Sequence, residues 1–226
     1  MGDLMTSNGV KTAQDIYEVY RIMPSLRLHQ LRVAAVGKTL CDNLTRDVDT
    51  RAVVLACLFH DMGNIIKSDL SLFPEFCEPE GIAHWEMVKR EFLETYGNDE
   101  HKATYAIARA IGLPEPAIRL MDDFGFSKLE LVRDGGSLEK KIAKYADLRT
   151  GPHGVVSMAS RLAEGKQRFS SKHPDTPRDE QEWERLTAAA YDMERQIFAE
   201  ATIAPEDITE QSIQPLIEEL RGFPLA

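Results

Sequence analysis

The sequence predicts an all-α protein, because apolar residues recur at helical spacing and no stretch alternates with the period of a β-strand. The chain has 226 residues, of which 43% are hydrophobic, and this suffices for a sizeable core. At roughly 150 residues per domain, the length favours one large domain with an appendage. We expect a helical bundle over residues 1–165 and additional helices over 166–226, packed on the bundle or on a partner.

The helix pattern is clearest in the first third of the chain. Apolar residues and His29 step along one stripe from Leu26 to Leu40, which predicts a helix there, preceded by a short one near residues 16–23. The stretch 50–61 is apolar all round, as expected at the centre of a bundle, and Asp49 is placed to cap it. Residues 64–82 contain two prolines and predict a long loop.

The same reasoning divides the rest of the chain. Glycine and proline mark the ends of most of these segments, and Ser137 is placed to cap one of them. Loops are expected at 125–136, 150–154 and 170–178. Helices are expected at 82–96, 99–112, 114–124, 137–148, 156–165, 183–197 and 209–221.

Charge and composition exclude several classes of protein. With 27 Lys and Arg against 37 Asp and Glu, the net charge is −10, which disfavours nucleic acid as a partner. No apolar run reaches the roughly 18 residues of a membrane-spanning helix, and no signal-peptide core is visible. The three cysteines are not closely spaced and predict buried free thiols. We expect a cytoplasmic protein, with a homo-oligomer left open.

Four side chains of metal-ligand type occur at the inward faces or ends of three predicted helices. They are His29, His60, Asp61 and Asp147. A charged aspartate at the end of an apolar helix is costly unless it is paired or bound to a cation. Two imidazoles and two carboxylates suit one divalent ion such as Mn, Fe, Co, Ni, Mg or Zn.

The segments around these residues carry a family resemblance. They read HQLRVA at 29–34, LACLFHDMGN at 55–64 and KYADLRTG at 144–151. In this order they resemble the HD-domain superfamily of metal-dependent phosphohydrolases, named after its His-Asp doublet, over about residues 20–165. The resemblance implies an HD-type helical bundle in which those four residues bind the metal.

The resemblance also implies hydrolysis of a small phosphate ester, most often a nucleotide, by a metal-activated water. Whether a monoester or a diester is cleaved stays open. In this chemistry Asp61 is the catalytic residue, which binds the ion and orients or deprotonates the water. Asn64 stands where some nucleotide-hydrolysing relatives carry an acidic residue, which puts that variant of the mechanism in doubt.

A phosphate substrate needs cations beyond the metal. We assign this role to Arg149, close to Asp147, and to Lys67, and give His84 a place in the substrate pocket. The alternative for each of the two cations is a solvated surface charge, and for His84 a core or pocket-wall residue.

Two other functions are weighed. An HD-type di-iron oxygenase needs further histidines, and the stretch near Arg109 lacks the second one that relatives with two metals carry. A non-catalytic, metal-stabilised helical module that binds a partner is also consistent with the amphipathic 183–197 stretch.

Overall fold

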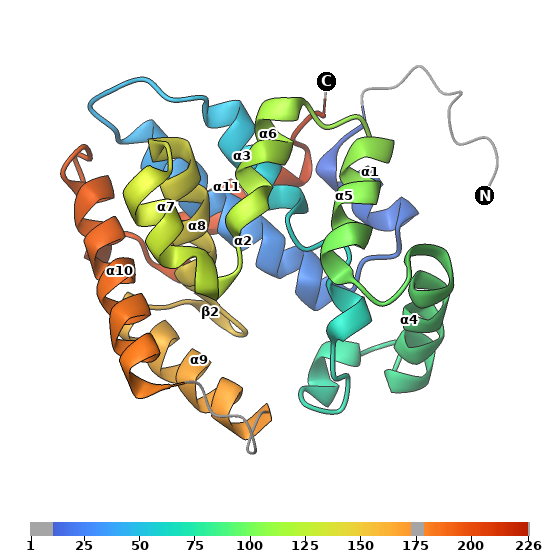
Figure 1. The fold of residues 1–226 in the computed structure, drawn as a ribbon. Helices are drawn as coiled ribbons and strands as arrows, with labels where there is room; N and C mark the ends of the chain where they lie inside the picture. Colours follow the sequence, from blue (N-terminus) through green and yellow to red (C-terminus); the bar gives the residue numbers. More distant parts are fainter. Residues whose placement is uncertain (1–10, 173–178, 226) are drawn as a thin grey trace.

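The structure, a computed structural model, describes residues 11–172 and 179–225 and confirms the all-α prediction (Figure 1). Within those described ranges, the only strands are β1 (Thr150–Gly151) and β2 (Gly154–Val155), which pair in a short antiparallel hairpin. The helices are α1 (Ala13–Val19), α2 (Pro24–Asp42), α3 (Thr50–Phe59), α4 (Ile82–Tyr96), α5 (Glu100–Ala110), α6 (Glu115–Leu120), α7 (Leu129–Gly135), α8 (Leu138–Leu148), α9 (Met158–Lys172), α10 (Glu180–Phe198) and α11 (Glu210–Arg221).

Helix α3 is the centre of the bundle. Every residue from Ala52 to Phe59 is buried, and α2, α6 and α8 pack around the helix. As expected, Asp49 caps its start and accepts a hydrogen bond of 2.9 Å from the Ala52 amide. An apolar helix covered on all sides holds the residues at its end in a fixed position.

The end of α3 differs from the prediction, and the difference shapes the site. The helix ends at Phe59, and residues 60–63 form a turn that presses against α5. The Gly63 amide donates to Thr104 Oγ1 at 2.9 Å. A Cβ on Gly63 would lie 2.3 Å from the Glu100 carbonyl oxygen, so only glycine fits this close approach.

Two segments predicted as loops contain helix. Residues 125–136 include α7, whose Leu129 and Val132 are buried and which packs on α10. Residues 64–82 include two 3₁₀ helices, η1 (Asn64–Lys67) and η2 (Pro74–Cys77). The extent of helix in these two segments was missed, because one or two turns are too short to show a period and the flanking glycines and prolines dominate the pattern.

The C-terminal helices pack on the bundle. Helix α11 lies against α2, α10 against α7 and α8, and α9 against α8 (Figure 1). Helix α9 runs past the predicted end at residue 165, so the expected domain boundary falls within it. Of the loop expected at 170–178, residues 173–178 lie outside the described residues. In the described part of the chain, no helix has both the length and the apolar character needed to cross a membrane.

Candidate metal centre

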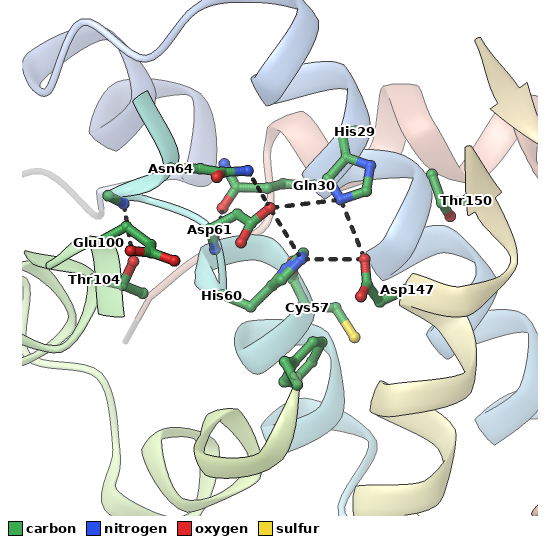
Figure 2. A network of polar contacts seen from close by, with 12 residues as sticks. His29, Gln30, Cys57, His60, Asp61, Asn64, Glu100, Thr104, Asp147 and Thr150 are labelled. Atoms are coloured by element: carbon green, nitrogen blue, oxygen red, sulfur yellow. Dashed lines mark hydrogen bonds and ion pairs between the residues drawn. The ribbon is translucent and has the colours of Figure 1, made fainter. Parts of the chain in front are cut away.

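The four predicted ligands come together at one point (Figure 2). His29 lies on α2, Asp147 on the last turn of α8, and His60 and Asp61 directly after α3. Nε2 of His29 is 3.4 Å from Asp147 Oδ1 and 3.8 Å from Asp61 Oδ2. Nε2 of His60 is 3.6 Å from Asp147 Oδ1 and 3.7 Å from Asp61 Oδ2. Each imidazole therefore faces both carboxylates.

These distances suit ligands that share an ion. They exceed the usual length of a hydrogen bond, whereas bonds of about 2.0–2.4 Å to one ion leave neighbouring ligand atoms roughly 3–4 Å apart. His29, His60 and Asp61 offer ligand atoms that all lie within 4.8 Å of one another, and Asp147 closes the ring from the other side.

His60 gives the clearest test of whether these residues fit a metal ion. Its side chain is 2% exposed, and Nδ1 lies 2.8 Å from the Cys57 carbonyl oxygen. A carbonyl only accepts, so Nδ1 carries the proton and Nε2 presents its lone pair. That buried Nε2 has no hydrogen-bond partner among the described residues. A buried acceptor without a donor costs free energy. Binding a metal ion through this lone pair would remove that cost, so His60 fits the role of a metal ligand.

The charges of the cluster are coupled. Burial opposes ionisation of Asp147, but the two imidazoles beside it outweigh burial and hold the pKa of this carboxyl well below its usual range. Burial likewise opposes protonation of His60, but Asp61 and Asp147 outweigh it and raise the pKa of His60. The carboxylates thus attract positive charge to this point, and the donor set suits a borderline or hard divalent cation.

Neighbouring side chains fix the Asp61 carboxylate and the His60 ring. Asn64 Nδ2 donates to Asp61 Oδ2 at 2.7 Å, and the Asp61 amide donates to Gln30 Oε1 at 3.2 Å. The ring of Phe124 stacks on His60 at 4.6 Å with 21° between the planes. Such partners orient metal ligands and tune their affinity. Sequence reasoning missed Gln30, which reads as an ordinary surface residue but is fully buried.

The cluster opens into a cleft of about 820 Å³. The four candidate ligands form part of its wall, and the wall also carries several basic and aromatic side chains among other residues. The basic residues are Lys67, His101, Lys144, Arg161 and Arg168, and the aromatic ones are Phe73, Phe76, Phe124, Phe126, Phe169 and Trp183. Several of them belong to α9 and α10, so the C-terminal helices help to build the cleft.

Lys67 lies where a substrate cation is expected. It lines the cleft with half of its side chain exposed, and its Nζ is 3.1 Å from Glu100 Oε1. Its role in substrate binding stays a prediction.

The assignment of Arg149 to the substrate is wrong. Its side chain is buried and does not line the cleft. The guanidinium donates to the carbonyl oxygens of Val156 at 2.6 Å, Pro205 at 3.2 Å and Ile208 at 2.9 Å. On a helix, a residue two positions after Asp147 points about 200° away from it. Arg149 instead ties the end of α8 to the C-terminal segment.

His84 also lies outside the cleft, which corrects its assignment to the substrate pocket. The buried stripe of α4 is Trp85, Val88 and Phe92, one position later than His84, whose ring stands edge-on to Trp85 at 4.9 Å.

His101 does line the cleft, but its side chain is 65% exposed. No second group of clustered His, Cys, Asp and Glu ligands appears within the described ranges, and the number of ions stays a prediction.

Three cleft cations were missed: Lys144, Arg161 and Arg168. Lys144 precedes Asp147 by three residues and so shares its helix face. The two arginines are seven apart, which places both on one face of α9. The helical register of α9 would have grouped the two arginines, but the helix predicted to end at residue 165 left Arg168 outside it.

Comparison with known proteins supplies the family. The model of the HD domain matches residues 27–150, which is more than half of the chain and includes all four ligands. The chain therefore belongs to the HD-domain family, within a superfamily of metal-dependent phosphohydrolases. The match ends before α9, α10 and α11 begin. Searches of curated proteins and of solved structures found no match.

Proposed function

We propose that this protein hydrolyses a small phosphate ester, a nucleotide, with His29, His60, Asp61 and Asp147 holding one divalent ion. The observation that carries the proposal is the convergence of these four side chains in a cleft, with the buried Nε2 of His60 left without a hydrogen-bond partner among the described residues. Such an ion lowers the pKa of a bound water and neutralises phosphate charge.

Asp61 is the proposed general base. Its Oδ2 faces both imidazoles and accepts from Asn64. The contacts of this carboxylate within the described chain use Oδ2, which leaves Oδ1 to take a proton. Because Asn64 holds the carboxylate in one orientation, Oδ1 stays available at a fixed place, which is what general base catalysis needs.

The cleft supports a nucleotide as substrate. Its volume of about 820 Å³ lies in the usual range for small-molecule sites. Phe73 and Phe76 stack at 5.1 Å on its wall and offer faces for a base. Lys67 adds an exposed cation for phosphate.

The test compares Asp61→Ala with His84→Ala. The purified protein is analysed for bound metal and screened against nucleotides and other phosphate esters with added Mn or Co. We expect phosphate release that falls by at least about 10³-fold in Asp61→Ala, because both the general base and an ion ligand are lost. His84→Ala removes a histidine outside the cleft and should keep metal and activity.

Two outcomes contradict the proposal. Full hydrolysis by Asp61→Ala assigns the activity elsewhere. Bound metal without turnover over the whole panel favours the non-catalytic helical module instead.

A further inference from the structure

We propose that Arg161 and Arg168 on α9 form a second anion subsite in this cleft, which makes the substrate a phosphate ester that carries a second phosphate group. The inference rests on the proposed function for the first phosphate, at the metal centre. It adds a site built by a helix that the HD-domain match does not cover.

The two arginines form a prearranged pair. Both line the cleft, and both contact one carboxylate: Nη1 of Arg161 lies 2.5 Å from Glu164 Oε2, and Nη1 of Arg168 lies 3.3 Å from Glu164 Oε1. Glu164 thus holds the guanidinium groups side by side on one helix face. Two arginines around one glutamate leave a net positive charge, which an anion would balance.

The Arg161 side chain has donor capacity left over. It is 16% exposed, and its buried Nε has no hydrogen-bond partner among the described residues. A guanidinium presents its donors as a planar fork that matches two phosphate oxygens. An unsatisfied buried donor costs free energy. A phosphate that accepts hydrogen bonds from this pair of arginines would offset that cost.

The electrostatics of Arg168 agree with this geometry. Burial, and then the neighbouring Arg161, lower the pKa of Arg168, while Glu164 and Asp147 raise it. The wall also holds Lys67, which pairs with Glu100 at 3.1 Å and is half exposed, in a chain of net charge −10. An acidic protein that gathers cations in one cleft is built to attract an anion there.

The test measures binding to the metal-loaded full chain by calorimetry. Two matched sets of probes are used: fructose 6-phosphate against fructose 1,6-bisphosphate, and adenosine 5′-monophosphate against its 5′-diphosphate and 3′,5′-bisphosphate. We expect the doubly phosphorylated member of at least one set to bind at least about 10-fold more tightly. Arg168→Ala should lower this affinity ratio towards 1. The loss of one charge-assisted contact can account for a decrease of at most about 10–100-fold.

The controls separate charge from structure. Arg185→Ala removes an exposed arginine of α10 and should leave the ratio unchanged. Arg168→Lys keeps the charge without the fork and should restore part of the ratio. Thermal unfolding and metal content, measured on each variant, show that the fold and the metal centre are intact. Arg161→Ala repeats the test on the more buried partner.

The outcomes distinguish this inference from the proposed function. A ratio near 1 in the wild type, for every set, overturns the subsite, and so does an unchanged ratio in both Arg161→Ala and Arg168→Ala. If doubly phosphorylated probes bind in an arginine-dependent way while no probe is hydrolysed, the subsite stands and the proposed hydrolysis fails.

Discussion

The two walls of the cleft are built in different ways. The metal wall consists of His29, His60, Asp61 and Asp147, held by α2, α3 and α8 inside the matched HD domain. The arginine wall consists of Arg161 and Arg168 on α9, outside that match. His60 is 2% exposed and fixed by a backbone carbonyl, whereas Arg168 is 36% exposed and forms an ion pair with Glu164, one turn away on the same helix.

This difference matches the two tasks that the proposed hydrolysis requires. Reacting groups need fixed geometry, because small displacements cost large factors in rate. Substrate contacts tolerate longer, more mobile side chains, and they change from one family member to another while the chemistry stays the same. The metal wall lies within the part of the chain that the family model matches, and the arginine wall lies outside it.

The largest effect is expected from breaking the metal wall. His60→Ala removes a buried ligand and leaves Asp147 and Asp61 without one of their partners. We expect loss of the metal and a fall in kcat of at least about 10³-fold. Metal analysis and steady-state kinetics measure it. His101→Ala, which removes an exposed histidine of the same cleft, should retain the metal; equal metal loss in both variants would contradict the assignment.

The sequence predicts which residue types form this site better than it predicts the direction in which a helical side chain points. The four candidate metal ligands were predicted correctly to lie together, because their types and segments carry the family pattern. Arg149 and His84 were misplaced because each is only one or two positions from a correctly directed residue, and each position rotates a helical side chain by about 100°. Helix α7 was missed because buried Leu129 and Val132 span a single turn.

The second effect concerns Arg149, which ties the end of α8, next to Asp147, to Val156 before α9 and to the C-terminal segment. Arg149 bonds the carbonyl oxygens of Pro205 and Ile208 from the end of α8 and lies over the Tyr145 ring at 5.5 Å. Arg149→Ala leaves these buried acceptors unpaired, so we expect about 3 kcal/mol less stability, measured by urea unfolding. Arg168→Ala should cost far less stability. If Arg149→Ala and Arg168→Ala have the same free energy of unfolding, the hydrogen bonds of Arg149 are unimportant for stability.

The third effect contrasts the packing of the walls. Gly63→Ala places a Cβ against the Glu100 carbonyl, and such overpacking costs about 1–3 kcal/mol. Gly165→Ala on α9 meets only Arg161 Nη1, at an ordinary 3.6 Å, and should stabilise the helix by about 0.5–1 kcal/mol. Chemical denaturation of both variants measures the contrast. Opposite signs support a tight metal wall and a looser arginine wall, and destabilisation of equal size would remove the distinction.

The smallest effect tests whether the metal wall is tuned as well as built. Asn64 Nδ2 donates to Asp61 Oδ2 at 2.7 Å and sets the orientation of the carboxylate without joining the ligand cluster. Asn64→Ala should therefore weaken metal affinity by about 10-fold, the lower end for lost partners of metal ligands, while the fold stays intact. Competition with a chelating dye measures the affinity. Asn43→Ala is the matched control, since its Nδ2 bonds the Thr39 carbonyl at the far end of α2. If Asn64→Ala kept wild-type affinity, Asp61 would be oriented by its backbone alone, through the amide that donates to Gln30.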